Sequence, residues 1–256
     1  MKHSFIDKYS DLDSLIHRLD PRTKFIASLA FIVLVVLTPI RNWQAFALYF
    51  GLIATCLAIS KLPHLYVLKR SLVIFPFVLM IAIFIPFFKP GEVVGSYNIW
   101  LWKVSVTYDG LLILANVAVK AWLCILSLIL LSATTRFGDL LKGLKQLGVP
   151  EVIVLILSFM YRYIFVLVDE VMRMRRARDS RNFGGGRLRQ LKTIGNMIGT
   201  LFIRSYERGE RVYAAMLARG FDGEIRSLYQ LNFKKVDAYF GVAFCLVLAS
   251  LGIIFW

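Results

Sequence analysis

Residues 111–132 read LLILANVAVKAWLCILSLILLS and contain a single charged side chain, Lys120. A helix needs about 20 predominantly apolar residues to cross the hydrocarbon core of a bilayer. The segment therefore predicts a membrane-spanning helix. Further apolar runs, several of them shorter, lie at residues 25–39, 43–59, 72–88, 152–168 and 238–256.

The composition of the whole chain agrees with a membrane protein. Of its 256 residues 58% are hydrophobic, and the mean hydropathy is +0.67, whereas an ordinary soluble domain is about 45–50% apolar. The net charge is nevertheless +15. These values exclude disordered, collagen-like and disulfide-stabilised classes. They also argue against a nucleic-acid-binding protein, which would carry its positive charge on a polar surface.

The residues that follow 152–168 decide how many apolar runs cross the membrane. Within them, residues 173–192 carry eight cations against one acid, Asp179. The cations are Arg173, Arg175, Arg176, Arg178, Arg181, Arg187, Arg189 and Lys192. Because basic loops stay on the cytoplasmic side, residues 152–168 are predicted to remain on the inner side. The prediction is then five spans, with the basic N-terminus inside and the C-terminus outside.

The predicted fold is all-α, a polytopic helical membrane protein with about five transmembrane helices and a cytoplasmic pair of long helices. Its predicted parts are a cytoplasmic segment at 1–24, four transmembrane helices in 25–132, the cytoplasmic helix pair in 133–236 and the last span at 237–256. The first long helix is expected to begin at Pro150 and to run to about Phe183. The second is expected to end at Gly220, because glycine commonly follows a helix C-terminus.

The two long helices end in related sequences, Ala177-Arg178-Asp179 and Ala218-Arg219-Gly220. An arginine near a helix C-terminus interacts favourably with the helix dipole, and its guanidinium can hold a partner's carboxylate through two hydrogen bonds. These six residues are the candidate site for contact with a partner protein. In the alternative interpretation, the arginines only complement the dipole.

The sequence contains no recognisable catalytic or metal-ligating motif. His3, His17 and His64 are scattered, and there is neither a Cys/His cluster nor a P-loop for ATP. The prediction is a non-catalytic chain. A membrane enzyme acting on lipids and a stand-alone carrier remain alternatives. A carrier needs polar groups inside its spans, where Lys120 and Asn116 are candidates, and both a functional and a packing role for Lys120 stay open.

The Ala-Arg-Gly sequence at 218–220 resembles a motif of the transmembrane T component of energy-coupling factor (ECF) transporters, which are ABC-type importers of vitamins and metals. The sequence at 177–179 departs from that motif, since Asp179 stands in place of glycine. The stretch HRLDPRTK, residues 17–24, is similar to the CbiQ branch, which serves the uptake of cobalt or, in near relatives, nickel. Independently of the family, Asp20-Pro21 predicts a helix start.

The resemblance also implies partners and cargo. It implies that the two helix ends bind two CbiO-like ABC-type ATPases, which hold the ATP. The helices would pass the ATPase motion to a CbiM-like substrate-binding S component, with or without a CbiN-like small subunit. Cobalt, or alternatively nickel or a vitamin, would bind in that S component, so this chain is expected to hold no cofactor. The expected location is a bacterial or archaeal plasma membrane, where basic loops contact anionic lipids.

Overall fold

The computed structural model describes residues 9–10, 12–39, 42–88, 93–99, 102–181, 186–223, 233 and 235–255. Its internal contacts divide the chain into two units. One unit combines residues 2–143 with 231–256 and is called the bundle here. The other comprises residues 144–230 and is called the insert. The sequence prediction had drawn the edges of the inserted region at 133 and 236.

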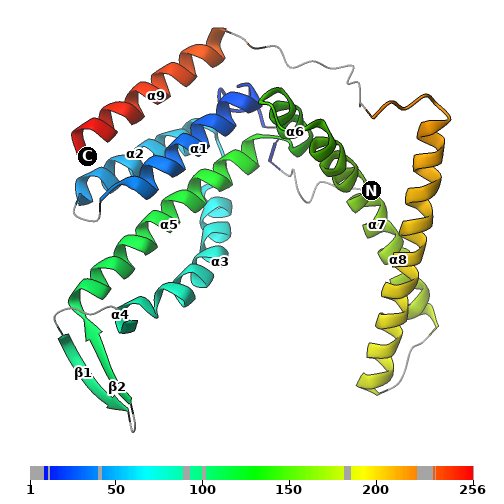
Figure 1. Ribbon diagram of the computed structural model, residues 1–256, viewed down its shortest axis with the longest axis horizontal. Helices are drawn as coiled ribbons and strands as arrows, with labels where there is room; N and C mark the ends of the chain where they lie inside the picture. Colours follow the sequence, from blue (N-terminus) through cyan, green and yellow to red (C-terminus); the bar gives the residue numbers. More distant parts are fainter. Residues whose placement is uncertain are drawn as a thin grey trace. The chain divides into compact units, whose positions relative to one another are not determined.

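The bundle is built around one long helix, α5 (Tyr108–Thr134). Four helices contact α5: α1 (Pro21–Leu37), α2 (Trp43–Ile59), α3 (His64–Ala82) and α4 (Ile85–Phe88). The last helix, α9 (Lys235–Phe255), packs on α1, as Figure 1 shows. The core side chains Phe31, Tyr49, Leu123 and Leu248 are almost fully buried. The apolar runs at 25–39, 43–59 and 72–88 therefore pack along α5, and the run at 238–256 packs on α1.

A β-hairpin interrupts the helical order between α4 and α5. Strands β1 (Val93–Ile99) and β2 (Trp102–Thr107) pair antiparallel, from Ile99 opposite Trp102 to Val93 opposite Thr107, with an irregularity between Val93 and Gly95. The hairpin is an exception to the all-α prediction, and it lies between two of the apolar runs, at 72–88 and 111–132. Its composition, rich in β-branched and aromatic residues, favours strands. Apart from this hairpin, the described elements are helices.

Among the described residues, four helices are long and apolar enough to cross a membrane: α3, α5, α7 (Glu151–Ser180) and α9. Helices α1 and α2 have 17 residues each, which lies at the lower limit for a span. The chain is thus a polytopic helical membrane protein. Because α7 contains residues 152–168 and qualifies by length and composition alone, the count of five spans stays a prediction.

The described part of the insert consists of two long helices, preceded by the end of a shorter helix. Helix α6 (Phe137–Gln146) begins in the bundle and ends in the insert, where Lys145 forms an ion pair with Glu151 at 2.6 Å. Helices α7 and α8 (Arg187–Leu217) run in opposite directions and contact each other (Figure 1). Pro150 precedes α7, whose first residue is Glu151, as the sequence predicted.

Candidate functional site

The C-terminus of α8 is closed by a tight hydrogen-bonded turn. The N–H of Phe221 donates to the carbonyl of Met216 at 3.1 Å, and the N–H of Gly220 donates to that of Leu217 at 3.0 Å. Gly220 has a φ of 77°. These bonds and this left-handed glycine form a Schellman motif, in which the backbone of the turn satisfies the last helical carbonyls. The sequence prediction that α8 stops at Gly220 is thus confirmed.

Arg219 lies in this turn, beyond the last helical residue, Leu217. Both Ala218 and Arg219 are exposed. Among the described residues, the guanidinium of Arg219 has neither a hydrogen bond nor an ion pair. The local backbone therefore holds this cation beyond the helix end, with its five N–H donors open to a partner.

The C-terminus of α7 has a different construction. Ala177, Arg178 and Asp179 all lie inside the last helical turn, because α7 continues to Ser180 and Arg181 is the cap. The Nε and Nη2 atoms of Arg178 donate to Oδ1 of Asp179 at 3.0 and 2.8 Å. The Arg178 side chain is 27% exposed. The expected end near Phe183 lies outside the described residues.

Glu170, which the sequence analysis did not single out, joins the two long helices. Its carboxylate accepts from Arg173 of α7 at 2.5 Å and from Arg204 of α8 at 2.6 Å. The spacing of Glu170 and Arg173, three residues apart on one helix, is visible in sequence. The pairing with Arg204 is not, because it spans 34 residues and a helix reversal. This carboxylate fixes one point at which α7 and α8 cross.

An apolar row on α8 remains exposed. Leu191, Ile194, Ile198 and Phe202 have exposed fractions of 69, 40, 62 and 70%. Their spacing of three or four residues puts them on one face of the helix. A soluble helix rarely leaves such a row open to water, so this face is suited to contact with a membrane or with a membrane protein.

Lys120 has a structural role in the bundle. Its Nζ donates to the carbonyls of Val36 and Thr38 at 2.8 and 2.7 Å. These carbonyls belong to the C-terminal end of α1, which leaves its last acceptors without helical donors. The lysine of α5 thus caps α1 from a neighbouring helix. This finding favours the packing interpretation over a carrier residue.

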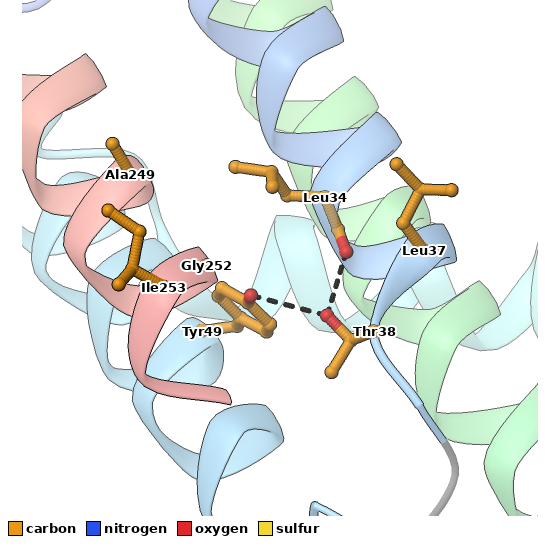
Figure 2. A pocket seen from close by; sticks show the side chains of 7 residues that line it. All are labelled: Leu34, Leu37, Thr38, Tyr49, Ala249, Gly252 and Ile253. Carbon is orange, nitrogen blue, oxygen red and sulfur yellow. Dashed lines mark hydrogen bonds between the residues drawn. The ribbon is translucent and has the colours of Figure 1, made fainter. Parts of the chain in front are cut away.

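Next to this cap lies an apolar cavity of about 440 Å³ between α1, α2 and α9. Figure 2 shows Leu34, Leu37 and Ile253 lining it, with Tyr49 and Thr38 on one side. The hydroxyl of Thr38 donates to the carbonyl of Leu34 at 2.7 Å and lies 3.2 Å from that of Tyr49. Because these polar atoms satisfy one another, the cavity offers an apolar surface.

No group of three or more potential metal ligands occurs among the described residues. His17 is engaged locally: its Nε2 lies 3.1 Å from the carbonyl of Tyr9, and its Nδ1 lies 2.7 Å from Oγ of Ser14. Burial lowers the pKa of His17. His64 begins α3, and His3 lies outside the described residues.

The stretch around Asp20 starts α1 as predicted. Asp20 is the N-cap, its side chain accepts the N–H of Arg22 at 2.9 Å, and Pro21 is the first helical residue. An aspartate cap followed by proline is a favoured helix start, since the cap accepts a free N–H and proline has none to satisfy. The predicted start is confirmed.

The comparison with protein families decides the identity. Residues 13–230 match the sequence profile of CbiQ, described as a cobalt transport protein. The chain belongs to the CbiQ family of ECF-transporter T components. The matched range covers both Ala-Arg sequences and the described turn that precedes α1. For this CbiQ-family chain, a multi-pass membrane location follows from the apolar helices and the transporter relatives.

Individual relatives support the same assignment. The chain is 31% identical to the energy-coupling factor transporter transmembrane protein EcfT of Listeria innocua, over 87% of this chain and 86% of the relative. It is 29% identical to EcfT of Acidaminococcus fermentans, over 98% and 96%. An uncharacterised protein of Methanocaldococcus jannaschii is 32% identical, over 98% and 86%. The CbiQ family resemblance thus extends over nearly the entire chain.

Proposed function

We propose that this chain is the non-catalytic T subunit of a cobalt importer, which couples two ABC-type ATPases to a separate substrate-binding membrane subunit. The observation that carries the proposal is the end of α8, where the Schellman turn holds an exposed Arg219 beyond the helix. The relatives named as EcfT, the transmembrane protein of energy-coupling factor transporters, support a transporter assembly in which such a helix end can bind a partner.

In the proposed mechanism, Arg219 binds a carboxylate in a groove of one ATPase through two hydrogen bonds. Such charge-assisted bidentate pairs are strong and fix the orientation of both partners. Arg178, between Ala177 and Asp179, makes the corresponding contact with the second ATPase. ATP binding draws the two ATPases together, and the two helix ends follow their grooves.

The helices then carry this displacement as stiff rods. Packed helices move as rigid bodies when one end is displaced. The carboxylate of Glu170, which also accepts from Arg173 of its own helix, links α7 to α8 through Arg204. The exposed apolar row of α8 offers the substrate-binding subunit a surface to follow. The T subunit therefore needs no catalytic group of its own, since ATP is hydrolysed in the ATPases.

Cobalt is proposed as the cargo because the matching family is described as a cobalt transport protein. The metal would bind in the substrate-binding subunit, a CbiM-like protein with or without a CbiN-like partner. Nickel and a vitamin are the alternative cargoes. Anionic lipids around the basic insert would accompany this function, at about 1 kcal/mol for each cation near the surface.

The test is purification of the tagged chain from its native membranes in mild detergent, followed by mass spectrometry of the proteins that accompany it. We expect two ATPases to accompany the native chain, and the one bound at the end of α8 to be lost with Arg219→Glu. Arg211→Glu is the matched control, since it makes the same charge change on an exposed residue inside α8. Retention of both ATPases by Arg219→Glu would overturn the site. A chain that never carries ATPases would overturn the coupling function.

Cargo is then measured as uptake of labelled cobalt and nickel by cells with and without the native chain. Cobalt uptake that depends on this chain is the expected result. Dependence of nickel uptake alone would assign the transporter to the nickel branch.

A further inference from the structure

The first turn of α1, Pro21–Lys24, meets three other parts of the bundle. They are the turn at 14–19, the end of α5 with α6, and the first turns of α9. Asp20 and Asp237 are 6% and 3% exposed, and Lys24 is 7% exposed. Three ionisable side chains so deeply buried are unusual in any protein, because burial of a charge costs free energy unless partners surround it. We call Asp20, Lys24 and Asp237 the α1 junction.

Lys24 connects α1 to two segments through backbone carbonyls. Its Nζ donates to the carbonyl of His17 at 3.1 Å and to that of Thr134, at the end of α5, at 2.9 Å. Lys24 precedes the apolar run at 25–39, and burial lowers its pKa to about 8, against the opposing effects of Asp139, Asp237 and Asp20. One ammonium group thus holds the turn before α1 and the last residue of α5.

Asp237 connects the same turn to α9. Its Oδ1 accepts the N–H of Asp20 at 2.9 Å, across 217 residues of sequence. The side chain of Asp20 in turn accepts the N–H of Arg22. Asp237 lies in the first turn of α9, where an acid also interacts favourably with the helix dipole.

Two glycines allow the backbones of α6 and α9 to lie close to this turn of α1. A Cβ atom on Gly143 of α6 would lie 3.4 Å from Cγ of Arg22. A Cβ atom on Gly241 of α9 would lie 3.2 Å from Cγ2 of Thr23. A methyl group at Gly143 would make ordinary van der Waals contact with Arg22, whereas one at Gly241 requires a small shift of Thr23.

The order of the elements along the chain relates these contacts to the insert. The chain leaves the bundle after Gly143, in α6, and returns to it at residue 231, just before α9. Along the chain, the insert is therefore continuous with the bundle through α6 on one side and through the residues before α9 on the other. Both of these helices are held on the same turn of α1.

We propose that the α1 junction is the positioning device through which displacement of the insert reaches the bundle. Both connections of the insert are fixed to one turn, so a movement of the insert acts on α1, α5 and α9 together and not on one loose helix. The inference rests on the proposed coupling function. Lys24 and Asp237 are positioning residues, since neither is proposed to touch an ATPase or the cargo.

The burial of these charges favours a positioning role for Lys24 and Asp237 over a role in stability alone. Replacing a buried set of charges by apolar groups of similar size is often neutral or stabilising, whereas charges with hydrogen-bond partners specify geometry. Removal of one partner leaves the others buried and lowers the yield of folded protein, so the prediction concerns the transporter that does fold, in which coupling is lost.

The experiment uses the complete transporter in liposomes and measures cobalt uptake and ATP hydrolysis in the same preparation. The variants are Lys24→Met and Asp237→Ala, and the readout is the ratio of uptake to hydrolysis. We expect ATPases to remain bound and ATP to be hydrolysed, while the ratio falls at least tenfold. Asp237→Asn should restore most of the ratio, because its amide oxygen still accepts the N–H of Asp20.

Lys120→Met is the matched control. Lys120 also donates to two backbone carbonyls within the bundle, but these bonds join α5 to α1. Neither α6 nor α9 takes part in them. We expect Lys120→Met to lower the yield of folded protein and to keep the ratio near its native value. An unchanged ratio in Asp237→Ala and Lys24→Met, or an equal fall in Lys120→Met, overturns the junction proposal.

A milder variant keeps the test decisive if the buried substitutions prevent folding. Gly241→Ala places a methyl group against Thr23, and the double variant with Thr23→Ser removes the methyl that it meets. We expect the ratio to fall severalfold in the first and to recover in the second, and absence of that recovery would contradict the proposal. Absence of any bound ATPase in the native preparation would instead overturn the coupling function and the inference with it.

Discussion

The two Ala-Arg sequences of the insert end their helices differently. At the end of α8, Gly220 adopts a φ of 77°, the helix stops, and Arg219 lies in the turn without a side-chain partner among the described residues. At the end of α7, Asp179 occupies the third position, the helix continues to Ser180, and Asp179 binds the guanidinium of Arg178. One substitution thus separates an open arginine from an internally paired one.

This difference bears on what each end can offer a partner. Arg219 can form a bidentate pair with a partner without giving up a hydrogen bond to a described residue. Arg178 must first lose its hydrogen bonds to Asp179, or must bind the partner while Asp179 stays attached. A carboxylate beside an arginine also reduces the positive potential that attracts an acidic groove. The two ends are therefore expected to differ in affinity even where their grooves are alike.

The largest expected effect is the reversal of charge at the open end. Arg219→Glu should weaken ATPase binding at least a hundredfold, because it removes a bidentate donor and adds a repulsive charge. Arg178→Glu should weaken it about tenfold, because part of that arginine's hydrogen bonding is already used. Binding of purified ATPases to each variant in detergent, measured at two salt concentrations, gives the comparison. Equal losses of affinity in the two variants would contradict the expected difference between the two helix ends.

A smaller effect is expected from the turn itself. Gly220→Val places a β-branched residue at a φ of 77°, where a left-handed backbone costs about 1–2 kcal/mol for a residue with a side chain. The Schellman turn should fray, and ATPase affinity should fall about tenfold while Arg219 is still present. Backbone hydrogen exchange at Gly220 and Phe221 measures the fraying. Gly209→Val, in the exposed interior of α8, makes the same change at a position without a left-handed φ and controls for the added side chain.

Conversion of the first end into the second sharpens the comparison further. Asp179→Gly removes the partner of Arg178 and creates an Ala-Arg-Gly sequence at 177–179. We expect ATPase binding to become about threefold tighter, since the arginine no longer has an internal competitor. The same titration measures it, with Asp169→Gly as a control for loss of one acid on the same helix. Weaker binding by Asp179→Gly would show that this acid assists the contact.

The smallest expected effect concerns the link between the helices. Glu170→Gln removes the charge that both Arg173 and Arg204 share. Spin labels at positions 177 and 218 should then give a broader distance distribution, with little change in ATPase affinity at either end. Glu207→Gln, which also loses a charge paired with arginine but within α8 alone, is the control. An unchanged distribution would remove Glu170 from the mechanism.

Local signals in the sequence predicted the parts of the site that depend on local physics. Gly220 predicted the end of α8, because glycine alone adopts the left-handed turn without steric cost. Asp20-Pro21 predicted the start of α1, because the cap acts on the next N–H groups. The hairpin at 93–107 was missed, since hydropathy does not separate a polar loop from two short strands.

The sequence by itself determined the apolar helices, the long helix pair with its two Ala-Arg sequences, and membership of the CbiQ family. Each of these depends on residues that are neighbours in the chain or on patterns repeated every few residues. Only the tertiary structure decided that Asp237 holds Asp20, that Lys120 caps α1, and that Asp179 binds Arg178 while Arg219 stays open. The first two are pairings of groups far apart in the chain, which no periodicity encodes. The third depends on where each helix ends relative to its arginine, and a shift of two residues there decides which side chains meet.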